Sequence, residues 1–392
     1  MIYFAFFVKI EWKTVCEVIM KRFLAILLLL CVALGALSGC KRKKYKPVES
    51  TAEEARVILT LSANGRSYDV KYELYRALFL TYKSEIDGGD ASVWTGEKKD
   101  DFINEINERI ISEAAEIFAV FELCERLGID LYTDEVEDEI YDMIRVSVEG
   151  GSWGENTYLG FDGDYEAYLD SLKSMYHNYS TSVLLMRYQI GRRLLDSHYI
   201  GSGTADDGAG KITDGAIEYN RETVLDFYSS DGASLILTTF VSEQISYTPR
   251  ELAEDIRLDV IEAAKSGVSR VREVMIGRGS PTEEAELESG RLVSRYSLSR
   301  EYEELGKTAA ELSAGEVGEI VETVSAEDGR RYYIIYKMEK SEEFFEENYA
   351  TVVLVYLCDA VGEVISMAAS TLKEGATFSE AYANIIHSEV HI

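Results

Sequence analysis

Histidine and cysteine, the side chains that most often carry out nucleophilic, acid–base or metal chemistry, are scarce in this chain of 392 residues. Its four histidines are His177, His198, His387 and His391. None of them lies between residues 199 and 386, so almost half of the chain contains no imidazole. The five cysteines are too few for a disulfide framework. Cys124 and Cys358 lie on apolar segments, where buried thiols are favoured over a disulfide between them.

Acidic side chains dominate the charge: 70 Asp and Glu against 40 Lys and Arg give a net charge of −30. A field this negative repels phosphate backbones, so we expect no nucleic-acid partner. The acidic runs at 251–255 and 283–288 are interpreted as solvated faces, and the Asp-Gly motifs at 87–90 and 162–164 lack the ligand spacing of an EF-hand. The glycine-rich segment 201–211 fails the phosphate-loop pattern and is interpreted as a linker. We therefore predict no metal site and no cofactor.

Residues 20–40 have the pattern of an export signal, whereas residues 1–19, which include Glu11 and Glu17, do not fit it. Basic residues at Lys21 and Arg22 precede a short apolar run, which ends in Leu37-Ser38-Gly39-Cys40. These last four residues resemble a bacterial lipobox, which implies that Cys40 is lipidated and becomes the first residue of the mature chain. Because Met20 begins a complete signal by itself, we expect the true start there, with residues 1–39 removed. The alternative is an uncleaved membrane anchor over about residues 23–39.

A basic cluster, 41–44 with Lys46, directly follows Cys40. Each Lys or Arg near an anionic membrane surface contributes ~1 kcal/mol of attraction, which supplements the weak anchoring by one acyl chain. The chain from Cys40 onward holds 36 basic and 68 acidic residues, so its body is repelled by the same surface. We interpret residues 40–54 as a lipidated tether and predict a membrane-anchored protein outside the cytoplasm.

Residues 55–230 have the pattern of a mainly helical domain. A short strand at 56–62 and a hairpin turn at Asn64-Gly65 come first. Helices are then predicted over 68–86, 99–127, 133–148, 165–177 and 180–198. An aromatic stripe on the first helix is a candidate surface for binding unfolded segments, because aromatic side chains offer a large contact area with a polar tip. It comprises Tyr68, Tyr72, Tyr75, Phe79 and Tyr82. The alternative is an ordinary helix face buried against Phe118 and Phe121.

The pattern changes at about residue 231. Strands are predicted near 233–240, 290–296 and 332–338, and helices near 250–265 and 300–312. Together with the segment 315–321, this gives a β-α-β-α-β-β order over 231–341, typical of a small α+β domain. Residues 342–392 are predicted to form a mostly helical C-terminal segment. The predicted fold class is therefore α+β, with a mainly helical domain and a small α+β domain.

The block 232–340 resembles a parvulin-type peptidyl-prolyl isomerase domain, which is FKBP-like in fold. The matching pieces, in the family's order and spacing, are 233–237, 289–292, 301–303, 312–317 and 333–337. The preceding helical region resembles the N-terminal domain of the SurA and PrsA class of extracytoplasmic folding factors. With the lipobox, the layout is similar to PrsA-like foldase lipoproteins. The resemblance implies a chaperone that binds unfolded or newly secreted polypeptides.

The resemblance also implies which positions of this chain correspond to the family's pocket. At these positions the residues of this chain differ from those of the family. The two histidine positions fall on Leu235 and Tyr333, and the pocket walls on Leu298 and Tyr302. Rotation about a peptide bond has a barrier of ~18–20 kcal/mol, and its catalysis requires polar groups suited to the twisted amide. With both imidazoles missing, we expect little or no isomerase activity and assign no catalytic residue. Two alternatives stay open: an active isomerase that uses the Tyr333 hydroxyl, and a cell-surface binding lipoprotein.

Overall fold

The computed structural model describes residues 45–392, except 88–89, 154–155, 159, 201–208, 211–216, 218, 243–245, 279–288, 297–299, 326–328, 386, 388–389 and 391–392. Residues 47–392 form one compact unit with its own buried cores, separate from residues 1–46. The predicted signal peptide and Cys40 lie outside the described residues.

A β-hairpin opens the compact unit, as the sequence predicts. Strands β1 (Val57–Ala63) and β2 (Arg66–Lys71) are antiparallel, with Leu61 opposite Tyr68. Asn64 and Gly65 join them with φ values of 53° and 76°, the positive range that a tight two-residue hairpin turn requires. The predicted helix at 68–86 begins later than expected, at Tyr72, because the preceding residues extend the hairpin.

The predicted helices follow the hairpin. They are α2 (Tyr72–Asp87), α3 (Lys99–Arg126), α4 (Asp134–Glu149), α5 (Tyr165–Ser174) and α6 (Tyr179–Ile200). Thr133 caps α4 by accepting a hydrogen bond from the Val136 amide, 3.4 Å away. Short elements that the sequence analysis does not predict lie between them: η1 (Ala91–Thr95) and the hairpin of β3 (Gly151–Trp153) with β4 (Asn156–Tyr158).

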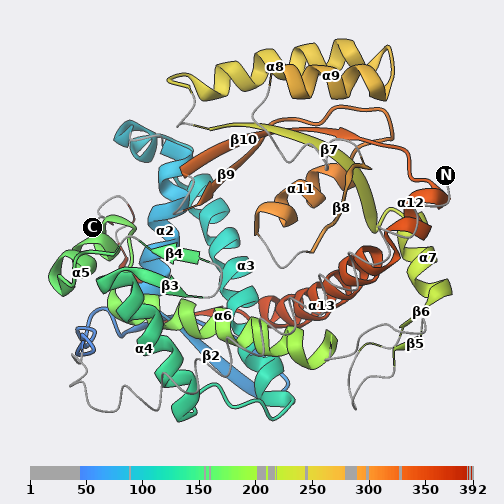
Figure 1. Ribbon diagram of the computed structural model, residues 1–392. Coiled ribbons are helices and arrows are strands. Elements are labelled where there is room, and N and C mark those ends of the chain that lie inside the picture. The colour runs from blue at the N-terminus through green and yellow to red at the C-terminus, as the bar shows by residue number, and fades with distance from the viewer. Residues whose placement is uncertain are drawn as a thin grey trace. The chain divides into compact units, whose positions relative to one another are not determined.

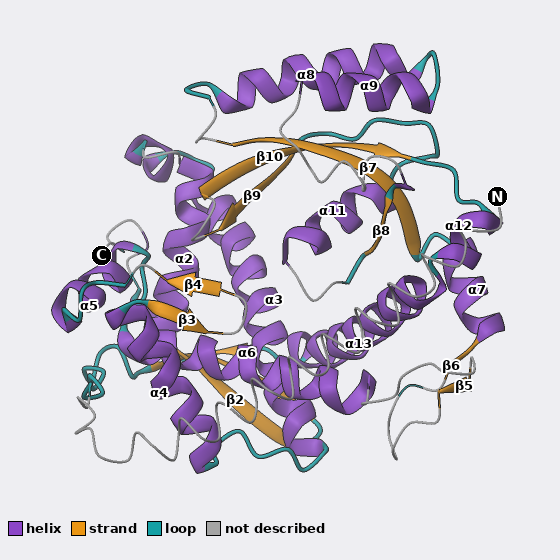
Figure 2. Cartoon of the chain, viewed as in Figure 1, coloured by secondary structure: helices purple, strands orange, loops and turns teal. Residues whose placement is uncertain are grey.

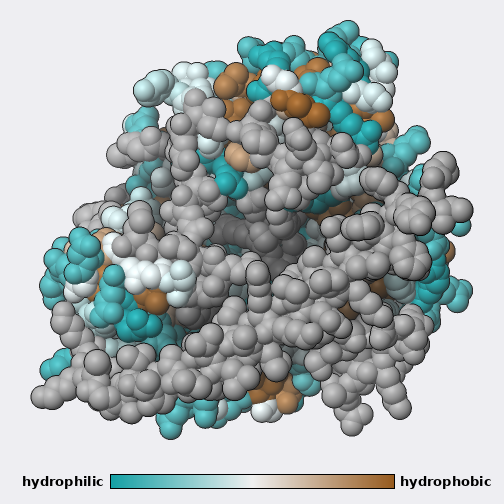
Figure 3. Space-filling model, viewed as in Figure 1, coloured by the Kyte–Doolittle hydropathy of each residue, from teal (hydrophilic) through white to brown (hydrophobic). Residues whose placement is uncertain are grey.

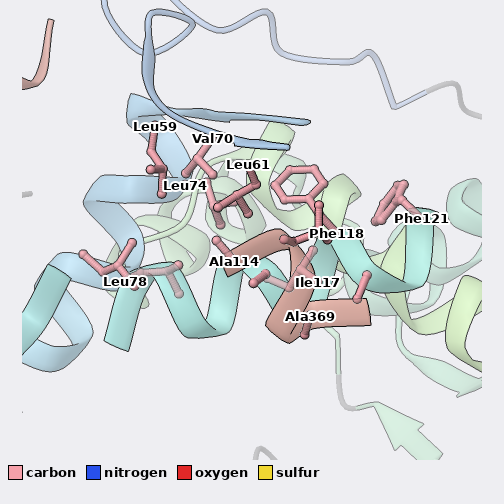
Figure 4. Close-up of a cluster of buried hydrophobic side chains, with 14 of the residues drawn as sticks. Leu59, Leu61, Val70, Leu74, Leu78, Ala114, Ile117, Phe118, Phe121 and Ala369 are labelled. Atoms are coloured by element: carbon pink, nitrogen blue, oxygen red, sulfur yellow. The ribbon is translucent and has the colours of Figure 1, made fainter. Parts of the chain in front are cut away.

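The C-terminal segment packs against the N-terminal hairpin and helices. It comprises α12 (Glu342–Glu347), α13 (Tyr349–Glu374), β11 (Thr377–Phe378) and η2 (Tyr382–Asn384). Strand β11 pairs with β1, which completes a three-stranded sheet in the order β11-β1-β2. Helix α13 packs against α3 (Figure 1), and Ala369 of α13 joins Leu59, Leu61 and Phe118 in one core (Figure 4). The first and last parts of the compact unit therefore share a hydrophobic core.

Helix α13 is also the one helix, within the described ranges, that is long and apolar enough to span a membrane. It has 26 residues and an apolar stretch of mean hydropathy 1.9. Helix α13 contacts α3, β1 and α6, and its Val361 and Leu372 side chains are fully buried. These contacts within the core explain why the helix is so apolar.

The block between these two parts is a four-stranded antiparallel sheet with helices on both faces (Figures 1 and 2). Its elements are β7 (Ala233–Ser242), α8 (Pro249–Ala264), α9 (Val268–Arg278), β8 (Arg291–Ser294), α11 (Arg300–Ala310), β9 (Val321–Ser325) and β10 (Gly329–Lys337). The strand order is β8-β7-β10-β9. The predicted order of strands and helices is found, with α9 added. Before the block lie β5 (Ala209–Gly210), β6 (Tyr219–Asn220) and α7 (Arg221–Ser229).

The two faces of this sheet bury different side chains, because successive residues of a strand point to opposite sides. Leu237 and Ile334 belong to the cluster formed with α8 and α9. Ile236, Tyr333 and Ile335 belong to the cluster formed with α11. Both faces are therefore covered, and the sheet is the core of an α+β domain.

A buried polar network ties the chain's end to α2. The Tyr75 side chain is 0% exposed, and its hydroxyl donates to Asn107 Oδ1 over 2.9 Å. The same hydroxyl oxygen lies 3.1 Å from His387 Nε2. Asn107 in turn donates to the Tyr382 hydroxyl over 2.6 Å. Polar contacts as well as apolar ones therefore hold the C-terminal segment against α2 and α3.

We predict that Tyr75→Phe lowers the free energy of unfolding by roughly 1–3 kcal/mol, because it leaves Asn107 and His387 with buried, unpaired polar atoms. Urea denaturation followed by circular dichroism measures this loss. Tyr132→Phe is the matched control, since Tyr132 is 68% exposed and its variant should unfold like the wild type. An equal midpoint for all three proteins would contradict the role assigned to the network.

Candidate functional site

The structure does not bring the predicted isomerase positions together. Tyr333 lies opposite Phe240 on the neighbouring strand, whereas Leu235, near the start of that strand, lies opposite Leu292. Leu235 belongs to a buried cluster with Phe345 of α12, and Tyr333 to the cluster under α11. Antiparallel register and the two-residue period of strands place them on opposite faces of the sheet. One pocket lined by both residues is therefore ruled out as the site.

Tyr333 has the environment of a core residue. It is 2% exposed, its ring lies 5.3 Å from that of Phe240, and Arg331 Nη1 donates to its hydroxyl over 3.3 Å. Of the two predicted pocket walls, Leu298 lies outside the described residues, and Tyr302 lies on α11 with its side chain outside them.

Among the side chains of this block that the structure describes, one charged side chain is buried, that of Lys337. Its Nζ donates to the carbonyl oxygens of Ala309 and Leu312, over 3.0 and 2.7 Å. These carbonyls lie at the end of α11, where an ammonium group satisfies acceptors that the helix leaves unpaired. Lys337 therefore fixes α11 on the sheet, and its hydrogen bonds leave it no evident acid–base role.

The aromatic stripe, which the sequence analysis offers as a client-binding surface, is largely buried. Tyr75 and Phe79 are 0% exposed and belong to the core of the helical domain. Tyr68 lies on β2 and stacks on Phe118 with ring centroids 5.6 Å apart, as the alternative interpretation expects. The remaining two are half-buried: the Arg56 guanidinium lies 4.4 Å from the Tyr72 ring, and the Tyr82 hydroxyl donates to Glu113. The three- and four-residue spacing of these aromatic side chains is also the spacing of a helix face that packs into a core.

A pocket of about 280 Å³ lies between α4, α5 and α6 of the helical domain. Apolar and neutral polar side chains line it: Met143, Ser147, Leu172, Met175, His177, Ser182, Leu185, Met186 and Gln189. Met175 is 53% exposed, whereas Met143 is 7% exposed, so the lining runs from the surface into the interior. We call this the methionine pocket. The sequence analysis missed it, because its residues come from three helices and share no spacing.

The turn between α5 and α6 holds His177 in this pocket. Tyr176 has a φ of 64°, and the His177 amide donates to the Leu172 carbonyl over 2.9 Å. Asn178 then caps α6 by accepting from the Thr181 amide over 2.8 Å, and its side-chain amide donates to Glu73 over 2.9 Å. The backbone on both sides of His177 is therefore anchored.

The His177 imidazole is held in its neutral form. Burial lowers its pKa below the usual value, against a smaller opposing effect of the Glu113 carboxylate. Its Nδ1 is buried and has no hydrogen-bond partner within the described part of the chain. The pocket can therefore accept apolar side chains, and the ring of His177, whose buried Nδ1 is unpaired, forms part of its lining.

A second, polar pocket of about 300 Å³ lies beside the end of β8. Its lining comprises Asp231, Gly232, Arg295, Tyr296, Asp359 and Glu363. Burial raises the pKa of Asp359 to about 6, although hydrogen bonds from Ser294 and the Tyr296 amide oppose the shift. This pocket joins β8 to α13: the Tyr296 side chain packs so tightly on Gly362 that a Cβ there would lie 2.2 Å from the Tyr296 Cβ.

Apolar side chains also reach the surface over α8 and α9 (Figure 3). Leu258 is 59% exposed and Ile276 is 54% exposed. Scattered exposed apolar residues of this kind are normal on a folded protein, and two do not make a binding face. Cys124 and Cys358 are both free and buried, as expected.

No protein-family model and no curated protein matches the sequence. Two solved structures of foldase protein PrsA are similar to it. The PrsA of Streptococcus pneumoniae str. Canada MDR_19A is 15% identical, with 74% of this chain and 95% of that chain covered and a TM-score of 0.23. The PrsA of Lactococcus lactis is 14% identical, with 83% and 96% covered and a TM-score of 0.21. Likeness at these TM-scores carries no argument about function, which must come from the sites described above.

We predict that Asp359→Asn raises the urea midpoint at pH 7.5, raises it less at about pH 5 and leaves it almost unchanged at about pH 3. The folded state favours the protonated acid, so the wild type loses stability as the pH rises from the unfolded pKa of about 3.8 through the folded value of about 6. The asparagine variant has no charge to bury. Asp231→Asn, in the exposed turn of the same pocket, is the control and should show no such pH-dependent gain.

Proposed function

We propose that this chain is a lipid-anchored folding factor that acts outside the cytoplasm and binds non-native secreted polypeptides. The observation that carries the proposal is the methionine pocket. Methionine side chains are flexible and polarizable, so they adapt to apolar groups of different shapes. Non-native chains expose apolar side chains of every shape, and a pocket that binds many of them needs an adaptable, uncharged lining.

The four-stranded block supports a binding function over an enzymatic one. Its β-α-α-β-α-β-β order fits the parvulin-type resemblance. Catalysis of peptide-bond rotation, however, would require polar groups placed around a twisted amide. The block has no histidine, its Tyr333 hydroxyl is engaged by Arg331, and Lys337 is engaged by α11. We infer a domain that keeps the scaffold and has little or no isomerase activity.

Charge supports the proposed location. The cluster 41–46 would draw the lipidated end to anionic headgroups, and the excess of acidic residues in the rest of the chain would keep the body off that surface. An acidic body also attracts basic segments of unfolded chains over a distance of about 10 Å at moderate salt. Tethering and client attraction therefore follow from two oppositely charged parts of one chain.

We predict that the fragment 41–392 suppresses the aggregation of a chemically unfolded model protein, measured by light scattering, and that Met175→Glu weakens this effect several-fold. The variant places a charge in the pocket, which an apolar side chain could enter only at the cost of desolvating it. Met175 is 53% exposed, so the fold should tolerate the change. Met367→Glu, on α13 at 66% exposure, is the matched control. No suppression by the unaltered fragment would refute the chaperone proposal.

We predict no measurable acceleration of prolyl isomerisation by the same fragment in a protease-coupled peptide assay. The reason is that the block contains no histidine, and that its Tyr333 hydroxyl and Lys337 ammonium group are engaged by other residues. Turnover that is lost in Tyr333→Phe would show instead that the domain is an active isomerase.

A further inference from the structure

We propose that the methionine pocket also binds a soft monovalent metal cation, of the class of copper(I). Three of the chain's eight methionines and one of its four histidines line this single pocket: Met143, Met175, Met186 and His177. Thioether sulfur is a soft ligand that selects copper(I), and imidazole nitrogen binds copper as well. This inference goes beyond the binding of polypeptides, which requires no histidine.

The four side chains come from rigid elements around one space. Met143 lies on α4, Met175 and His177 lie at the turn after α5, and Met186 lies on α6. The volume of about 280 Å³ leaves room for an ion between them. Methionine has three rotatable side-chain bonds, so its sulfur can turn toward a cation without movement of the backbone.

The unused nitrogen of His177 is the second observation. Its Nδ1 is buried, and no described residue donates to it or accepts from it. A buried polar atom without a partner costs roughly 1–3 kcal/mol, so such an atom needs an explanation. Nδ1 is buried away from the open space of the pocket, so a cation there would gain it as a ligand after the ring turns about its Cβ–Cγ bond.

The charges around the pocket favour a monovalent ion over a divalent one. None of the described residues that line it is Lys or Arg, and the nearby Glu113 carboxylate acts electrostatically on the His177 ring. No carboxylate and no thiolate belongs to that lining, whereas calcium and magnesium require oxygen ligands and zinc prefers thiolate, imidazole or carboxylate. Neutral thioethers with one imidazole therefore fit a single positive charge.

The test follows the methionine methyl groups directly, by NMR of the full-length chain carrying ¹³C-methyl methionine, in detergent. Accessible thiols are first blocked with N-ethylmaleimide, because thiolates also bind soft metals. Silver(I) is the probe, since it resembles copper(I) and is not oxidised in air. One equivalent should shift the methyl signals of Met143, Met175 and Met186 and leave those of Met275 and Met367 in place. Zinc(II) should shift none of them.

Variants decide which atoms bind. Replacing Met143, Met175 and Met186 together by Leu conserves volume and should weaken silver binding at least about tenfold, as should His177→Gln alone. The double variant Met275→Leu, Met367→Leu is the control and should bind like the wild type. If the triple variant does not fold, the single exposed change Met175→Leu replaces it. Unshifted pocket methyls, or binding that survives these changes, would overturn the proposal.

The same variant separates this inference from the proposed function. The triple leucine pocket remains apolar, so it should still suppress aggregation while it loses silver. If the unaltered chain binds silver but does not suppress aggregation, the folding-factor proposal fails and the cation site stands.

Discussion

The packing of α13 on α3 is the interaction on which the rest of the structure depends. Helix α13 lies near the end of the chain, yet it also contacts β1 and α6 of the helical domain and β8 of the four-stranded sheet. A single apolar helix therefore completes the helical core and supports the sheet. The four-stranded sheet therefore belongs to the same compact unit as the helices that precede it and follow it in the chain.

Local signals in the sequence were sufficient for most of the long helices and strands. Asn64-Gly65 fixed a hairpin through its positive φ values, and Thr133 fixed the start of α4 through its side-chain oxygen. Neither required knowledge of distant residues. The pairing of β11 with β1 joins residues more than 300 positions apart, and a two-residue strand leaves almost no periodic pattern to detect. The packing of residues 342–392 against the N-terminal hairpin was therefore beyond local reasoning.

The candidate site was predicted poorly, and strand register explains why. A resemblance by linear spacing assigns Leu235 and Tyr333 to matching positions, but the face of each side chain depends on how the two strands pair. Here Tyr333 lies opposite Phe240, so its side chain and that of Leu235 are buried on different faces. The aromatic stripe has a related limit, because helical periodicity shows that a face is apolar and not what covers it.

The methionine pocket shows what a sequence conceals and a fold assembles. Met143, Met175 and Met186 have no common spacing, and each alone is an ordinary apolar residue. Their convergence is compatible with a pocket for apolar side chains, since leucine and methionine would serve such a pocket almost equally well. His177 breaks that equivalence, because an apolar pocket gains nothing from a buried nitrogen without a partner. The sulfur atoms then acquire a chemical meaning, as soft ligands beside an imidazole, that leucine at the same positions would lack.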